Sequence, residues 1–131
     1  MRAQDFIDKA YNYALVGATT NQAKYGYRVL KDLSDAGFNI VGVNPKYQEI
    51  DEIKIYPTLK EVPQKPEVVI FVVPPEVGVK MLDEVAELGL KKVWFQPGAE
   101  SEAIQAKAKE FKIEAMADGS CIMVARRNLG L

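Results

Sequence analysis

Short apolar runs and amphipathic stretches alternate along this chain. The longest run, Val68–Val73, is six apolar and mostly β-branched residues in succession, which is typical of a parallel strand covered on both faces. The run therefore predicts a central strand. Other strands are expected at Tyr13–Val16, Asn39–Val43, Asp51–Tyr56 and Lys92–Phe95, with one or two short final strands at Ile113–Met116 and Ile122–Val124.

Between these runs, apolar residues recur at helical spacing. They predict a helix over Tyr25–Ala36, and Gly37 follows where a left-handed C-terminal cap is expected. A second helix is predicted from Pro75 to about Leu88, and a third over Ser101–Phe111. The buried face of the second helix is expected to consist of Val77, Met81, Val85 and Leu88. Short helices are also expected at Asp5–Tyr11 and after Thr58, where Thr58 and Glu61 fit a capping box.

Strands and helices that alternate in this way predict an α/β fold. Right-handed crossovers then give a doubly wound parallel sheet in a Rossmann-like, three-layer α/β/α domain, with strand order 3-2-1-4-5 and room for a sixth strand. We expect residues 1–131 to form one domain with its core at about 13–124. Ligands of such sheets bind outside the carboxyl ends of the strands, so candidate residues are sought there.

Charge and composition narrow the range of functions. The formal net charge of −1 provides no broad basic field, so we expect no nucleic-acid partner. No apolar run reaches about 18 residues and the N-terminus has no signal-peptide core, which favours a cytoplasmic protein without a membrane partner. The chain has no histidine and a single cysteine, Cys121, so Ser-His and Cys-His catalysis and zinc sites of paired cysteines are excluded, and no catalytic or metal-binding residue is assigned.

The stretch Ala14–Gly26 carries the most specific chemistry. An apolar run ends at Gly17, and small and polar residues lead to Gly26 and a helix start, an arrangement whose backbone N–H groups suit a phosphate. A dinucleotide fingerprint would need G-x-G-x-x-G and an acidic residue near the end of the second strand. Here the two glycines are nine positions apart, and Asn44 and Lys46 follow the second strand. A cation there suits a phosphate on the adenosine ribose, as in NADP or coenzyme A (CoA).

Six short motifs follow one another along the chain: Val16–Thr19, Lys24–Leu30, Val43–Pro45, Tyr56–Leu59, Val73–Pro75 and Gln96–Gly98. Together they resemble the small CoA-binding proteins, which are single Rossmann-like domains similar to the CoA-binding domain of the succinyl-CoA synthetase α chain. The likeness covers about Tyr13 to Gly119. It weakens after that point, because members of the family often have Asp-Arg-Cys where this chain has Asp118–Cys121.

The resemblance implies that CoA or an acyl-CoA binds along the carboxyl ends of the strands, without catalysis by this domain alone. The residues implied are Gly17, Ala18 and Thr19 for phosphate, with Lys24, Tyr25, Gly26 and Arg28 beside them; Asn44, Pro45 and Lys46 near the ribose and its 3′-phosphate; Val73, Pro74 and Pro75 against the adenine; and Gln96, Pro97 and Gly98 facing the pantetheine arm. Cys121 is either a small buried hydrophobe in a strand or a thiol that contacts CoA.

Other functions stay open beside CoA binding. One is an enzyme or redox partner that uses NADP or an acyl-CoA, with Cys121 taking part. Another is a subunit that joins a larger synthetase, and a homo-oligomer is a further possible assembly. The synthetases related to this domain need a phosphorylated histidine and a nucleotide-grasping domain, and this sequence has no histidine. A binding module therefore explains the sequence best.

Overall fold

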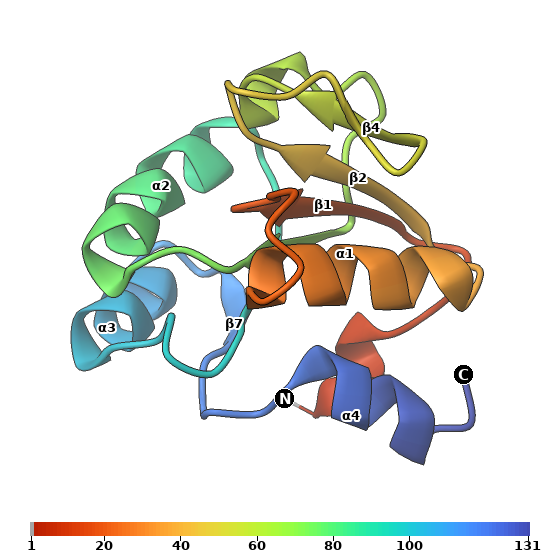
Figure 1. Cartoon of the computed structure of the whole chain (residues 1–131). Coiled ribbons are helices and arrows are strands. Elements are labelled where there is room, and N and C mark those ends of the chain that lie inside the picture. The colour runs from red at the N-terminus through yellow and green to blue at the C-terminus, as the bar shows by residue number, and fades with distance from the viewer. Residues whose placement is uncertain (1) are drawn as a thin grey trace.

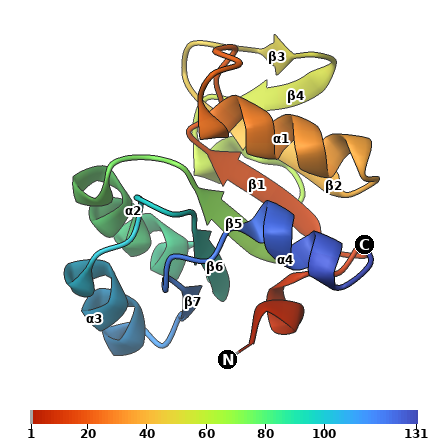
Figure 2. The same ribbon diagram turned by 60° about the horizontal axis from the view of Figure 1, so that its bottom comes forward.

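The computed structural model describes residues 2–131, and Met1 lies outside this part. Within it, the chain forms a seven-stranded sheet, whose strands run from β3 at one edge to β7 at the other (Figure 2). The strands are β1 (Asn12–Val16), β2 (Asn39–Val43), β3 (Glu49–Ile50), β4 (Ile53–Tyr56), β5 (Val68–Phe71), β6 (Lys92–Phe95) and β7 (Glu114–Met116). Their order in the sheet is β3-β4-β2-β1-β5-β6-β7.

The parallel part of the sheet confirms the Rossmann-like prediction. Strands β4, β2, β1, β5, β6 and β7 pair in parallel, which is the expected order with its sixth strand, and only β3 pairs antiparallel, with β4. β1 lies between β2 and β5, with Leu15 opposite Gly42 on one side and Ile70 on the other. The strand order therefore reverses at β1, which is the position where α/β sheets bind ligands.

Helices cover both faces of this sheet (Figure 1). The helices are α1 (Tyr25–Asp35), α2 (Pro75–Glu87), α3 (Glu102–Glu110) and α4 (Ile122–Asn128), with 3-10 turns at Ala3–Phe6 and Leu59–Glu61. α1, α4 and the N-terminal turn pack on one face, and α2 and α3 pack on the other. Alternate residues of β1 feed the two cores: Tyr13 and Leu15 point toward α1, and Ala14 and Val16 point toward α2.

The end of α1 forms as the sequence predicts. Gly37 has a φ of 92°, in the left-handed region, and the N–H of Phe38 donates to the carbonyl of Leu33 at 3.0 Å. These are the features of a glycine cap that satisfies the last carbonyls of a helix. The cap turns the chain directly into β2.

The predicted strand at Ile122–Val124 is wrong, because these residues begin α4. Ile122 is buried, whereas Val124 is 50% exposed, and the helix lies beside α1 and the N-terminal turn. Three apolar residues in a row favour a strand locally, but here the sheet already ends at β7. Cys121 accordingly lies at the N-terminal cap of a helix and is only half-buried, not a buried residue in a strand.

The two short helices also differ from their prediction. The first is a single 3-10 turn at Ala3–Phe6, earlier and shorter than Asp5–Tyr11. After Thr58, one 3-10 turn forms in place of a capped helix, because the Thr58 hydroxyl donates to the Glu61 carboxylate at 2.9 Å and accepts no backbone N–H. The predicted buried stripe of α2 is confirmed at Val85, and Met81 and Leu88 pack partly buried against the core, but Val77 is 45% exposed. Gly78 and Leu82 are buried in addition.

No helix among residues 2–131 is long and apolar enough to cross a membrane.

Candidate nucleotide-binding site

The turn from β1 into α1 is built on two glycines in contact. Gly17 has a φ of 104°, and a Cβ atom on it would lie 2.2 Å from the carbonyl oxygen of Val72. Gly26, in the first turn of α1, would place a Cβ atom 2.1 Å from the carbonyl oxygen of Gly17. Only glycine therefore allows α1 to begin directly against the end of β1.

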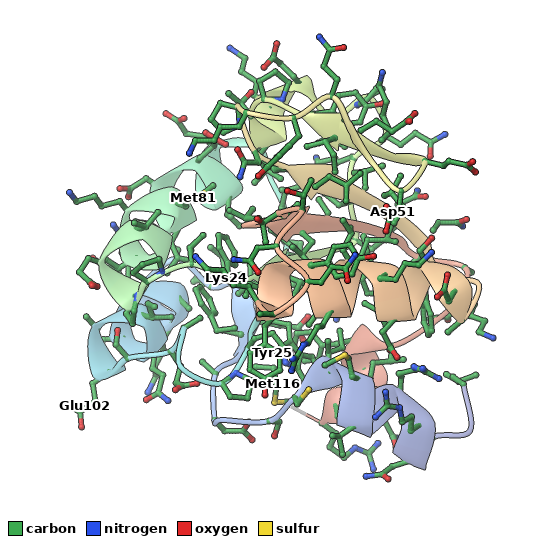
Figure 3. The ribbon with its side chains drawn as sticks, viewed as in Figure 1. Lys24, Tyr25, Asp51, Met81, Glu102 and Met116 are labelled. Atoms are coloured by element: carbon green, nitrogen blue, oxygen red, sulfur yellow. The ribbon has the colours of Figure 1, made fainter. Side chains whose placement is uncertain are left out.

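The loop between these glycines is ordered by its own polar side chains. The N–H of Asn21 donates to the Thr19 hydroxyl at 3.2 Å, and the N–H of Ala23 donates to the Asn21 side chain at 3.0 Å. α1 then begins with no side-chain cap and no acidic residue in its first turn. Its positive dipole end is therefore available to an anion, with Lys24 and Tyr25 at this end of the helix (Figure 3).

Asn44 ties the loop after β2 to the loop after β1. Its side-chain amide donates to the carbonyl of Ala18 at 2.8 Å, and its side-chain oxygen accepts the N–H of Lys46 at 2.8 Å. Its own N–H donates to the carbonyl of Tyr56, at the end of β4. One asparagine thus holds the ends of three neighbouring strands in a fixed arrangement.

Three cationic side chains lie on these loops and in the first turns of α1. Lys24, Arg28 and Lys46 are exposed, and within residues 2–131 none of them forms an ion pair with a carboxylate. The Nε of Arg28 donates to the carbonyl of Gln22 at 3.3 Å, and its guanidinium lies over the ring of Tyr25. Beside Lys46, the Tyr47 hydroxyl takes part in a hydrogen bond with Thr20, which lowers the pKa of Tyr47 below its ordinary value.

A cleft of about 310 Å³ opens beside these loops, between the ends of β2 and β4 and the first three turns of α2. Its volume is at the lower end of the range for small-molecule sites. It is lined by Val16, Gly17, Val43, Asn44, Pro45, Pro57, Thr58, Leu59, Val73, Val77, Met81 and Glu84. Most of these side chains are apolar, so the cleft suits a flat, uncharged ring next to a polar edge.

Four of the residues implied by the resemblance line this cleft: Gly17, Asn44, Pro45 and Val73. Sequence reasoning missed Pro57 and Leu59, although Tyr56–Leu59 was one of the six motifs. It also placed Val77 and Met81 in the core; Met81 does pack partly against the core, but both side chains line the cleft. The spacing of those two residues marked a helix face correctly, but that face borders the cleft.

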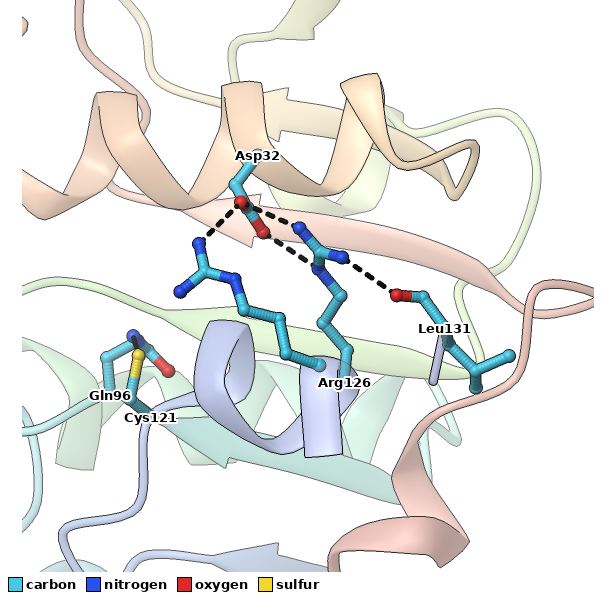
Figure 4. Close-up of polar contacts among 6 residues, drawn as sticks. Asp32, Gln96, Cys121, Arg126 and Leu131 are labelled. Carbon is cyan, nitrogen blue, oxygen red and sulfur yellow. Dashed lines mark hydrogen bonds and ion pairs between the residues drawn. The ribbon is translucent and has the colours of Figure 1, made fainter. Parts of the chain in front are cut away.

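The end of β6 lies against the start of α4. Gln96 is fully buried, and its side-chain oxygen accepts the N–H of Ile122 at 2.8 Å. Its side-chain amide donates to the Cys121 sulfur at 3.3 Å (Figure 4). Gln96 thus holds the start of α4 against the sheet. Pro97 and Gly98 are exposed beyond it, and Cys121 lines a separate hollow beside Ala3. Contact of these residues with a pantetheine arm stays a prediction.

The parallel sheet, the glycine turn at the reversal of strand order and the cleft beside it define a Rossmann-like nucleotide-binding domain. The comparison with known families agrees with this class. Residues 11–127 match the model of the CoA binding domain, and the chain belongs to that family. The resemblance derived from the six motifs is thereby confirmed.

Relatives in the curated proteins are ADP-forming acetate–CoA ligases. The ligase from Methanocaldococcus jannaschii is 35% identical over 86 residues, which are 66% of this chain and 12% of the ligase. The alpha subunit of ligase II from Pyrococcus furiosus is 32% identical over 90 residues, which are 68% of this chain and 20% of the subunit. The chain therefore corresponds to between about an eighth and a fifth of the length of these relatives.

Solved structures of similar size share the fold along nearly the whole chain. A conserved hypothetical protein from Pyrococcus furiosus has a TM-score of 0.83 and 48% identity, over 88% of this chain and 98% of that protein. A hypothetical protein from Pyrococcus horikoshii has a TM-score of 0.89 and 30% identity, over 100% of this chain and 94% of that protein. The domain thus occurs as a chain of about this length as well as within ligases.

Proposed function

We propose that this chain binds CoA or an acyl-CoA at the carboxyl ends of its parallel strands. The observation that carries the proposal is the joined set of loops around the Gly17–Gly26 contact, where an uncapped helix start, three cations and an apolar cleft lie together. CoA combines a diphosphate, a 3′-phosphate and an adenine. The family match and the ligase relatives support the same ligand.

The phosphates and the adenine have separate places in this arrangement. The diphosphate would lie over Gly17–Thr19 at the start of α1, where backbone N–H groups and the helix dipole favour an anion. The 3′-phosphate would lie near Lys46, and the adenine would enter the cleft between Pro45 and Val73. Lys46 therefore supplies the selectivity for a phosphorylated ribose.

Titration calorimetry with CoA, dephospho-CoA, NADP and NAD tests this function. We expect CoA to bind most tightly, and Lys46→Ala to weaken CoA by about threefold to tenfold while changing dephospho-CoA little, because only CoA carries the 3′-phosphate. Lys109→Ala, an exposed lysine on α3, is the matched control. Tighter binding of NAD than of CoA contradicts the proposal.

A binding role without catalysis is the simplest reading of the residues at this site. Lys24, Arg28 and Lys46 can hold and orient an anion, and we assign no general acid, base or nucleophile to the cleft. Any acyl transfer would then need a partner such as the remainder of a ligase. Mass spectrometry of the purified protein identifies the ligand that it carries, either free or attached to Cys121, and so distinguishes CoA from acyl-CoA. Turnover of an acyl-CoA by the protein alone contradicts the non-catalytic part of the proposal.

A further inference from the structure

Glu84 is a half-buried acidic residue on the wall of the cleft. Its Oε1 atom is buried, and within residues 2–131 it is the one buried side-chain oxygen or nitrogen without a hydrogen-bond partner. A buried acceptor left unpaired costs stability, and native proteins keep few such atoms. Because this atom lies on a cleft, a hydrogen-bond donor on the molecule that enters the cleft would satisfy it.

The position of Glu84 along α2 places it at the inner end of the cleft. Val77, Met81 and Glu84 are at positions i, i+4 and i+7 and so share one face of the helix. α2 starts at the carboxyl edge of the sheet and runs away from it, so Glu84 lies about 10 Å deeper along the helix axis than Val77. Figure 3 marks Met81, one turn before Glu84, on α2.

We propose, on the basis of the CoA site above, that Glu84 accepts a hydrogen bond from the amino group of the adenine. The ribose and phosphates would lie at the outer end of the cleft, near Gly17 and Lys46. The amino group is on the opposite side of the adenine from the ribose bond, so it points inward, toward Glu84. A carboxylate only accepts hydrogen bonds and the adenine amino group donates them, so the two groups match.

The charge of Glu84 makes this assignment selective. CoA is a polyanion, so a carboxylate is unfavourable in its site unless it lies away from the phosphates and meets a donor. The cleft that Glu84 lines is otherwise mostly apolar, with Met81 one turn away on the same helix face and Leu59 on the opposite wall, and apolar surroundings strengthen a hydrogen bond made there. A base with an oxygen in place of the amino group would set two acceptors against each other. At that position Glu84 therefore favours the amino group of adenine over the oxygen of hypoxanthine.

The test compares CoA with its deaminated analogue, in which hypoxanthine replaces adenine, by titration calorimetry. We expect the wild-type protein to prefer CoA by about tenfold to a hundredfold, the range for a hydrogen bond to a charged group. In Glu84→Gln the amide can donate to the hypoxanthine oxygen, so the preference should fall to about onefold or reverse. Glu87→Gln, an exposed residue at the end of the same helix, should keep the wild-type preference.

A second measurement separates recognition from a structural role. If Glu84 is kept for its ligand, Glu84→Leu should raise the thermal unfolding midpoint of the ligand-free protein, because it removes the unpaired buried oxygen. A lower midpoint overturns the assignment. So does equal affinity of the wild-type protein for CoA and its analogue, or an unchanged preference in Glu84→Gln. If the wild-type protein binds neither molecule, the proposed function itself is overturned, which is a different result from equal binding.

Discussion

At the scale of single residues, the contact between Gly17 and Gly26 decides how closely α1 approaches the sheet. A Cβ atom on either glycine would meet a backbone carbonyl at 2.2 Å or less, and backbone cannot move aside as a side chain can. Gly17→Val would therefore displace the backbone at Val72, directly after β5, as well as change the loop that follows β1. Lys46→Ala is therefore the cleaner probe of the site.

Gly26→Ala tests this close approach. Within a helix, glycine to alanine normally stabilises by about 1 kcal/mol, but here we expect a net loss of about 2 kcal/mol, because the new methyl group overlaps the Gly17 carbonyl. The measurement is urea unfolding. Gly78→Ala is the control: it is also a helical glycine, but its Cβ atom would meet the ring of Phe95, a side chain, at 2.9 Å. Gly26→Ala should be the less stable variant, and the reverse order contradicts the prediction.

At the scale of elements, the sequence predicts well what is set by local pattern. The run that begins at Val68 becomes the central strand β5, and the turn at Gly37 ends α1, since both depend on residues close together in the chain. In α2 the predicted stripe is right at Val85 but wrong at Val77, which is exposed at the cleft, because hydrophobicity alone does not distinguish a cleft wall from a core. The carboxyl-end loops were found because topology fixes where they meet.

α4 could not be predicted because its partners are distant in the sequence. Arg126, on α4, donates to both carboxylate oxygens of Asp32, on α1, at 2.9 and 3.0 Å, and a separation of 94 residues divides the two (Figure 4). Arg126 also donates to the carbonyl of Leu131 at 2.7 Å. Together with the bond from Ile122 to Gln96, these contacts favour a helix over the strand that the apolar residues suggest.

Arg126→Ala should loosen α4 from α1. The two side chains of the Arg126–Asp32 pair are only 17% and 16% exposed, so the loss leaves a half-buried carboxylate with fewer partners. We expect the free energy of unfolding to fall by about 2 kcal/mol in urea unfolding at neutral pH. Arg127→Ala is the control, since Arg127 makes one contact with the same Asp32 and is 56% exposed; its cost should stay below about 1 kcal/mol. Equal losses in the two variants contradict the assignment.

At the scale of the whole molecule, one sheet separates two cores, and the candidate site lies along the edge that both cores support. The β1–α1 turn forms the floor of the site, and the core on the α1 face of the sheet supports it. Helix α2 forms the wall of the cleft, and the core on the opposite face supports it. Sequence reasoning could therefore find the loops that meet at this edge. It could not find the cleft, because the distance between Leu59 and Met81 depends on how both layers pack onto β2 and β5.

Tyr13 makes the stability of the whole fold depend on pH in the alkaline range. It is 2% exposed, its hydroxyl donates to the carbonyl of Phe6 at 2.7 Å, and burial raises the pKa of this hydroxyl well above its ordinary value of 10.0. Below about pH 10 Tyr13 is protonated in both the folded and the unfolded state, so it adds no pH dependence. Above that pH the unfolded chain releases the proton and the folded protein keeps it, so stability falls as pH rises.

The free energy of unfolding should accordingly decrease above about pH 10. The contribution of Tyr13 to this slope should approach about 1.4 kcal/mol per pH unit, which is the limit for the release of one proton. Urea unfolding at about pH 8 and about pH 11 measures it. Tyr13→Phe should be less stable at the lower pH, because it loses the bond to Phe6, but should show a shallower decline. Val29→Ala, which opens a cavity in the same core, should lose stability and keep the wild-type slope. The hydrogen bond to Asp51 raises the pKa of Tyr27, so Tyr27 adds a slope of the same sign in the wild-type protein and in both variants. Only the difference in slope between the wild-type protein and Tyr13→Phe therefore reports on Tyr13, and an unchanged slope in Tyr13→Phe contradicts its role.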